Sequence, residues 1–168
     1  MPETVTIRRV TAEDGGRSRA LRLEMLADAP LAFITTLAQA AETPHAEFAH
    51  RCANAASGEE IAQFVADAGR RLVGQAIGMS APGAPGRTLL VAVYVSPSYR
   101  GTGLLAALVD TVGAWSRECG RDILDLEVVT GNTRAVRAYA KLGFQPVGAT
   151  VPHPTIPELC EQRMTRPA

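Results

Sequence analysis

The sequence predicts one α/β domain over residues 1–168, with a mixed, mostly antiparallel sheet of about seven strands and flanking helices. Three observations predict this class. Short β-rich apolar segments are interleaved with segments whose apolar residues recur at helical spacing. One apolar strand leads through a helix to a further strand, as in a crossover between parallel strands. The length of 168 residues suits a single domain, and no internal repeat or low-complexity segment divides it.

The expected elements follow the order β-α-α-β-β-β-α-β-α-β-β. Thr11 is the expected N-cap of the first helix, which Pro30 terminates. Thr43 is the expected N-cap of the second helix, with Pro44 at its first helical position. We expect strands over 4–10, 61–67, 71–81, 88–95, 123–129, 144–150 and 159–165, and helices over 12–27, 43–55, 104–118 and 132–142.

The composition excludes several classes of function. Seventeen basic and seventeen acidic residues cancel, so we expect neither nucleic acid nor a membrane surface as a partner. Three scattered cysteines indicate reduced thiols, and no cysteine or histidine pair has the spacing of metal ligands. No charged-then-apolar leader opens the chain, and no apolar run reaches spanning length. We therefore expect a cytoplasmic protein without a metal site.

The segment from Val91 to Leu105 carries the strongest functional signal. An apolar strand stops at Pro97, a loop with Arg100, Gly101 and Gly103 follows, and an apolar-periodic helix then begins. The first amides of a helix have no intrahelical acceptor, and they converge with the positive end of the helix dipole. This arrangement predicts an anion site for a phosphate or pyrophosphate.

Two blocks of the chain resemble the GNAT superfamily of N-acetyltransferases. The first is Val95-x-Pro97-x-Tyr99-Arg100-Gly101-x-Gly103, which is similar to the family's acetyl-CoA motif. The second runs from Leu126 through Asn132, Tyr139 and Gly143-Phe144 to Gly148, and resembles the second conserved block. The segment from Arg22 to Phe33 also looks like the substrate-side helices of one subgroup. The resemblance therefore covers nearly the whole chain.

The resemblance implies a GNAT-like fold and acetyl-CoA as cosubstrate. It implies that the main chain of Val93, Tyr94 and Val95 faces the pantetheine arm, and that a bulge splays this strand from the next. The residues expected to hold the cofactor are Val93, Tyr94, Val95, Arg100, Gly101, Thr102, Gly103, Leu104, Leu105, Ala106 and Asn132. Asn132 is also a candidate helix N-cap. Tyr139 lies two helical turns from Asn132, on the same face, and is the expected general acid for the departing thiolate.

The implied reaction is direct transfer of an acetyl group to a primary amine in a ternary complex. The acceptor, a small amine or a peptide or protein amine, stays open. Its site is expected between residues 27–55 and the loop 151–157, and a homodimer is plausible. Strand 88–95 lacks the glutamate that many members use as general base. The base is then Glu127, Glu24, His153 or water, although loop histidines are more often only exposed.

Two alternatives compete with this hypothesis. Leu105 stands where the family often has Gly or Ala, and could crowd a pyrophosphate or shift the helix start. A GNAT-like module that binds CoA without catalysis, as a sensor or partner-binding domain, is therefore the main rival. Gly101-x-Gly103-x-x-Ala106 followed by Asp122 also satisfies a dinucleotide fingerprint. That fingerprint needs its first glycine directly after the strand, whereas residues 97–100 intervene here.

Overall fold

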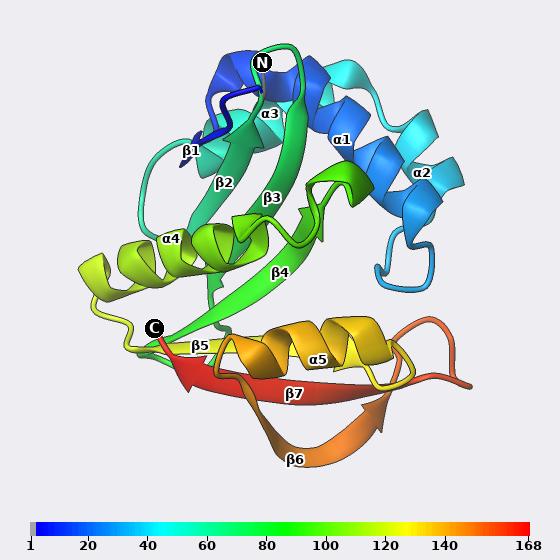
Figure 1. Ribbon diagram of the computed structural model, residues 1–168, viewed down its shortest axis with the longest axis vertical. Helices are drawn as coiled ribbons and strands as arrows, with labels where there is room; N and C mark the ends of the chain where they lie inside the picture. Colours follow the sequence, from blue (N-terminus) through cyan, green and yellow to red (C-terminus); the bar gives the residue numbers. More distant parts are fainter. Residues whose placement is uncertain (1–2) are drawn as a thin grey trace.

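A computed structural model describes residues 3–168 and shows one seven-stranded sheet in the order β1-β2-β3-β4-β5-β7-β6 (Figure 1). The β4–β5 pair is parallel, and every other neighbouring pair is antiparallel. The strands are β1 (Thr6–Arg9), β2 (Ile61–Asp67), β3 (Leu72–Ser80), β4 (Arg87–Val95), β5 (Ile123–Val129), β6 (Gln145–Pro152) and β7 (Cys160–Pro167). The predicted α/β class is therefore confirmed.

Helices cover the two faces of the sheet differently. The helices are α1 (Gly15–Asp28), α2 (Leu37–Glu42), α3 (His45–Ala55), α4 (Leu104–Glu118) and α5 (Thr133–Lys141), with short 3₁₀ turns at Ala12–Asp14 and Pro97–Tyr99. Leu21 of α1 and Cys52 of α3 pack with Val65 in one buried cluster. Leu108 of α4 packs with Phe64 and the inward residues of β5 in the other. The sheet thus separates α1 and α3 from α4 and α5.

Three helix boundaries differ from the sequence predictions. Residues 12–14 form a 3₁₀ turn before α1, because the Asp14 carboxylate accepts the Thr11 backbone N–H at 2.8 Å and bonds Arg8. The prediction missed α2, which begins after Thr36; the Thr36 hydroxyl caps it by accepting the Gln39 N–H at 3.2 Å. Pro44 precedes α3 as its N-cap, so Thr43 is not the cap.

Strands β4 and β5 are paired only at one end. The parallel register joins Arg87, Thr88 and Leu89 to residues 123–125. The rest of β4 pairs with β3 but not with β5. At this closed end the Arg87 guanidinium donates two hydrogen bonds to Asp125, at 2.6 and 2.7 Å. Beyond it the two strands diverge, and the sheet opens into upper and lower halves in Figure 1. In the diverging part, residues 91–93 are only half-buried, although the apolar sequence of β4 suggests burial on both faces.

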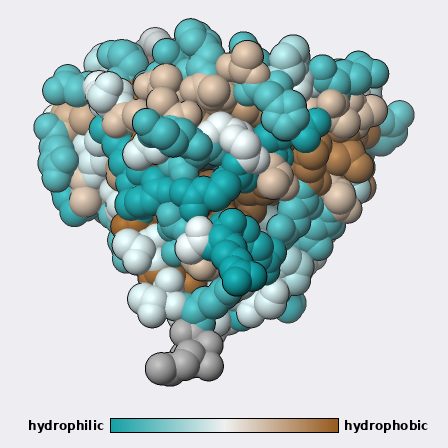
Figure 2. Space-filling model, turned by 90° about the horizontal axis from the view of Figure 1, so that it is seen from above, coloured by the Kyte–Doolittle hydropathy of each residue, from teal (hydrophilic) through white to brown (hydrophobic). Residues whose placement is uncertain are grey.

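The surface around α2 carries exposed apolar side chains. Figure 2 shows hydrophobic atoms near the right edge of the molecule, the side on which Figure 1 places α2 and the loop before it. Leu31, Ile34 and Leu37 are the exposed large apolar residues of this segment. Among residues 3–168, no helix combines the length and apolar character that a membrane span requires.

Candidate active site

The split between β4 and β5 forms a cleft of about 980 Å³. Its walls come from β4, β5, the start of α4, one face of α5 and the loop after α1. Ten of the residues expected from the sequence line it: Val93, Tyr94, Val95, Arg100, Gly101, Gly103, Leu105, Ala106, Asn132 and Tyr139. Thr102 and Leu104 do not. The Thr102 hydroxyl donates to the Tyr99 carbonyl at 2.6 Å, and Leu104 packs against the core.

The β4 wall contains a bulge with a strained residue. Gln75 pairs with Tyr94 and Ile77 with Val91, so Ala76 alone lies opposite Ala92 and Val93. Ala92 has φ +51°, the left-handed region that a residue with a Cβ rarely occupies. The expected bulge is therefore present, and it stands where β4 has left β5.

Buried amide side chains hold this bulge. The Gln75 side-chain amide donates to the Ala92 carbonyl at 3.0 Å, and its own oxygen accepts from Gln63 at 3.0 Å. The same Gln63 nitrogen lies 3.3 Å from the hydroxyl of Ser18 on α1. Both glutamines are at least nine-tenths buried. A carbonyl turned out of the strand ladder thus has a fixed partner, which avoids the cost of a buried unpaired acceptor.

The loop before α4 forms an open cradle for an anion. Gly101 and Gly103 have φ of +76° and +84°, so both positions need glycine for their backbone conformation. The first amide of α4 with a helical acceptor is that of Ala107, which donates to the Gly103 carbonyl at 3.1 Å. The amides of residues 104–106 precede that bond and are left for a ligand.

Leu105 leaves the predicted start of α4 in place. The helix begins at Leu104, as the sequence predicted, and Gly103 is its N-cap. The Leu105 side chain is half-buried and packs against the core while it borders the cleft. Leu105 therefore does not shift the start of the helix.

The Arg100 side chain is engaged within the protein. Its guanidinium bonds Asp28 of α1, and its Nε donates to the Val95 carbonyl at 3.0 Å. It also lies 5.7 Å from the centre of the Tyr94 ring. The side chain therefore ties the cradle loop to α1, and its hydrogen-bonding groups are largely engaged within the protein.

Tyr139 and Asn132 face the cleft from α5. The Asn132 side chain accepts the Ala135 N–H at 3.2 Å, so it caps the helix as well as lining the cleft. The Tyr139 ring packs edge-on against Phe144, with centroids 5.7 Å apart. Burial raises the pKa of the Tyr139 phenol above its ordinary value, and the phenol keeps its proton at neutral pH.

The candidate bases from the sequence lie in different environments. Glu24 accepts hydrogen bonds from Ser96 at 2.5 Å and from Tyr94 at 3.2 Å, so its carboxylate is already used. Glu127 is exposed and pairs with Arg163 at 3.4 Å. His153 is 4% exposed, so the expectation of an exposed loop histidine is wrong.

Glu161 is a cleft residue that the sequence reasoning missed. It lies on β7, opposite Val129, and is nine-tenths buried while still lining the cleft. The only sequence signal was an acidic residue within an alternating strand. Its meaning depends on the β5–β7 register, which a single sequence does not specify.

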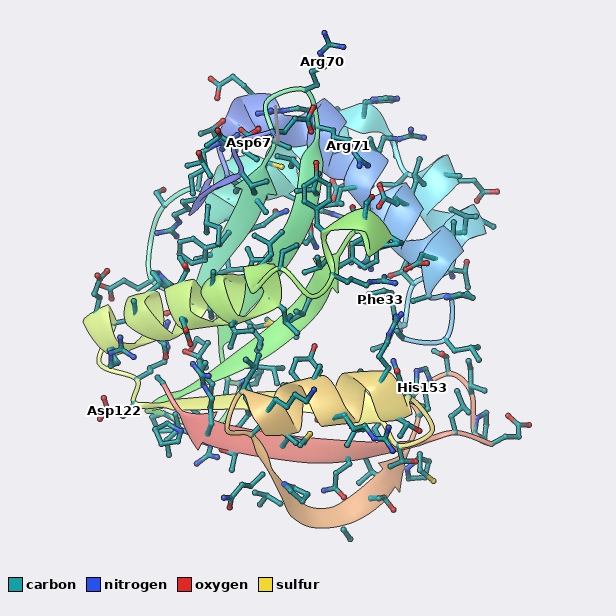
Figure 3. The ribbon with its side chains drawn as sticks, viewed as in Figure 1. Phe33, Asp67, Arg70, Arg71, Asp122 and His153 are labelled. Atoms are coloured by element: carbon teal, nitrogen blue, oxygen red, sulfur yellow. The ribbon has the colours of Figure 1, made fainter. Side chains whose placement is uncertain are left out.

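Two sides of the molecule differ in what they place near the cleft. Figure 3 shows Phe33, from the loop after α1, and His153, from the β6–β7 loop, on the same side of the molecule. These loops are the ones between which an acceptor was expected. Asp122 lies on the opposite side, beyond the C-terminal end of α4. With 15 residues in α4, that end is about 22 Å from the cradle, so Asp122 cannot complete a dinucleotide site there.

Known proteins share this arrangement. A structure of a GNAT-family acetyltransferase from Streptococcus pneumoniae matches with a TM-score of 0.81 at 18% identity, over 98% of this chain and 99% of that one. The Salmonella typhimurium protein yncA, solved with its cofactor acetyl-CoA, matches with a TM-score of 0.76 at 18% identity, over 98% and 94%. A GCN5-related N-acetyltransferase from Kribbella flavida matches with a TM-score of 0.76 at 25% identity, over the full length of both chains.

The sequence alone also identifies a family. None of the curated proteins that were searched matches it. The model of the acetyltransferase (GNAT) family, however, matches residues 25–144, which include the cradle, the split strand, Asn132 and Tyr139. The chain therefore belongs to the GNAT family of acetyltransferases, which use acetyl-CoA.

Proposed function

We propose that this acetyltransferase transfers the acetyl group of acetyl-CoA to a primary amine by direct attack in a ternary complex. The observation that carries the proposal is the split between β4 and β5, bordered by the open amides of α4 and by Tyr139. The cleft admits a long polar cosubstrate, and glycines line its anion cradle. A Cβ at Gly101 or Gly103 would meet no protein atom within 4 Å, which leaves that space for a ligand.

Each wall of the cleft has a separate task. Acetyl-CoA supplies the acetyl group as a thioester, from which an amine displaces the CoA thiolate. The main chain of residues 93–95, released from the β5 ladder, offers hydrogen-bonding groups to the pantetheine arm and the carbonyl. Tyr139 is placed to donate a proton to the departing sulfur, and its raised pKa keeps that proton available. Positioning of both substrates supplies much of the acceleration.

Acetyl-CoA binding and turnover test the proposal together. Calorimetric titration with acetyl-CoA is expected to give a Kd on the order of micromolar. A screen of amines by release of free thiol then identifies an acceptor. Tyr139→Phe is expected to lower kcat roughly ten- to a thousandfold with little change in acetyl-CoA affinity.

The possible outcomes separate the two functions considered for this fold. Unchanged kcat in Tyr139→Phe would remove the acid role of the phenol. Tight binding of acetyl-CoA without thiol release from any amine would favour the non-catalytic CoA-binding module.

A further inference from the structure

Glu161 carries a nearly buried carboxylate that the fold leaves without a hydrogen bond. Glu161 as a whole residue is 9% exposed, its side chain alone is 12% exposed, and the residue lines the cleft. Within residues 3–168 its nearest charged or titratable partner is the His153 Nε2, at 3.9 Å from Oε1, which is beyond hydrogen-bonding distance. The carboxylate oxygens keep contact with solvent at the cleft, and a cationic group arriving there would supply a charge-assisted hydrogen bond.

The histidine beside it is held in one orientation. The backbone N–H groups of Thr155 and Ile156 both donate to His153 Nδ1, at 3.2 and 3.1 Å. Because Nδ1 accepts, the ring proton of the neutral imidazole lies on Nε2, the atom that faces Glu161. This N–H points toward the Glu161 carboxylate from 3.9 Å, beyond hydrogen-bonding distance.

Glu161 lies on the opposite face of the lower sheet from Tyr139. In the β5–β7 register Val129 is opposite Glu161, and Glu127 is opposite Arg163, so these four side chains share one face. The alternate residues Leu126, Val128 and Met164 belong to the buried cluster against which Tyr139 packs. The cleft passes between β4 and β5, and therefore meets Tyr139 from one side and Glu161 from the other.

The surroundings keep the carboxylate basic. Burial raises the pKa of Glu161 above its ordinary value, and the negative charge of Glu127 on β5 raises it further. His153, in the loop before β7, acts in the opposite direction but does not reverse the shift. Residue 151 of β6, which pairs with Glu161 on its other side, is a valine and adds no charge.

We propose that Glu161 is the general base of this acetyltransferase, receiving a proton from the ammonium form of the acceptor. The inference rests on the proposed N-acetyl transfer. Of the three side chains that the sequence offered, Glu24 is already hydrogen-bonded and His153 does not line the cleft. Glu127 lines the cleft as well, but it is exposed and pairs with Arg163. The acceptor class that fits is an amine protonated at neutral pH, which the unpaired carboxylate attracts before it accepts the proton.

The proposed reaction balances in protons and electrons. The acceptor ammonium gives one proton to Glu161, which passes it to water. The nitrogen lone pair then forms the C–N bond to the acetyl carbon while the C–S bond breaks, and its electron pair stays on sulfur. Tyr139 protonates that sulfur, and the second proton released by the nitrogen restores the phenol. The sum is one ammonium and one thioester converted to an amide, a thiol and one proton.

Glu161→Gln tests the assignment, because it keeps the size of the side chain and removes the base. The probes are the twenty L-amino acids and an alanine-initiated tetrapeptide, with wild type defining the best acceptor. At pH 7 we expect kcat/KM for that acceptor to fall about a hundredfold, with unchanged acetyl-CoA affinity by calorimetry. Most of the loss should be regained near pH 10, where the amine is neutral on its own. A purely structural defect would not recover with pH.

Glu127→Gln is the matched comparison on the same face. The assignment is overturned if Glu161→Gln retains wild-type kcat/KM at pH 7, if its loss does not recover at high pH, or if Glu127→Gln shows the larger, pH-rescued loss.

A measurement on the wild-type protein is independent of turnover and of the folding of any variant. In a ¹³C NMR titration with acetyl-CoA bound, Glu161 should titrate above the ordinary glutamate value of about 4.3. A titration at or below that value overturns the assignment. If no probe amine is acetylated, the proposed function fails on that result, and the titration still decides whether Glu161 is basic.

Discussion

The two ends of the β4–β5 pair differ in strand pairing and in the side chains that stabilise them. At the closed end, three residues of β4 pair with β5, and Arg87 donates hydrogen bonds to the buried carboxylate of Asp125. At the open end there is no ladder, Ala92 is strained, and buried glutamines hold its carbonyl. The closed end is stabilised by strand pairing and charge. The open end is stabilised by side chains that replace the missing strand partner.

This contrast indicates where mutations should separate stability from function. Changes at the closed end should loosen the fold and affect the cleft only indirectly. Changes at the open end should alter ligand binding or turnover directly, and only its buried glutamines should also carry a sizeable cost in stability.

The largest effect is expected at the cradle. Gly103→Val places a β-branched residue at φ +84° and a side chain where the anion should lie. Displacing one charge-assisted amide contact would weaken acetyl-CoA binding about ten- to a hundredfold, measured by calorimetry. Gly58→Val is the matched control, because Gly58 has φ +85° and equally open surroundings in the turn after α3. Equal loss of affinity in both variants would show that strain, not the cradle, is responsible.

Next in size is removal of the ion pair at the closed end. Asp125→Ala leaves the half-buried Arg87 without its two hydrogen bonds and should lower the free energy of unfolding by about 2 kcal/mol. By thermal melting this is roughly 4–8 °C for a chain of this size. Asp110→Ala breaks an ion pair with Arg166 in which the aspartate is 65% exposed, and should cost less than about 1 kcal/mol. Similar costs would contradict the special role of the closed end.

The same variant carries a pH signature. Arg87 lowers the pKa of Asp125 below its ordinary value, and a smaller lowering contribution comes from Thr165. A lowered pKa in the folded state stabilises the fold above the unfolded pKa of about 3.9 and loses that effect as the pH falls through the folded pKa. The difference in unfolding free energy between wild type and Asp125→Ala should therefore be full above about pH 5 and shrink below about pH 4. A difference independent of pH would exclude the charge as its source.

The sequence predicted the glycine loop and α4 better than the β7 side of the cleft. Strands 61–67 and 123–129 and helix 104–118 have the predicted boundaries, because apolar periodicity and glycine signals are local. The cradle depends on the same short segment, and its glycines were visible. Glu161 and His153 depend instead on the register of β7 and on a loop that folds back over it, and both are long-range properties. The missed helix α2 is six residues long, too short to show an apolar period.

The glutamine chain behind the bulge should show a smaller, functional effect. Gln75→Leu removes the donor to the Ala92 carbonyl and the acceptor for Gln63, which should cost about 1–3 kcal/mol of stability. We expect kcat to fall about tenfold as the main chain of residues 93–95 loses its fixed orientation. Gln63→Leu leaves the Gln75 donor to the Ala92 carbonyl in place, so it is the matched control for the bond to the bulge. Normal kcat in Gln75→Leu would mean that the bulge keeps its shape without this bond.

The smallest expected effect tests the strain itself. Ala92→Gly removes the Cβ that disfavours φ +51°, a relief of about 1–2 kcal/mol, against a loss of chain entropy of about 0.5–1 kcal/mol. Stability measured by urea unfolding should therefore be unchanged or up to about 1 kcal/mol higher, while acetyl transfer falls a few-fold as the bulge gains freedom. Ala76→Gly, at the fully buried residue opposite the bulge, should instead destabilise by about 1 kcal/mol. If both substitutions destabilise equally, Ala92 is not strained, and the open end owes its shape to the glutamines alone.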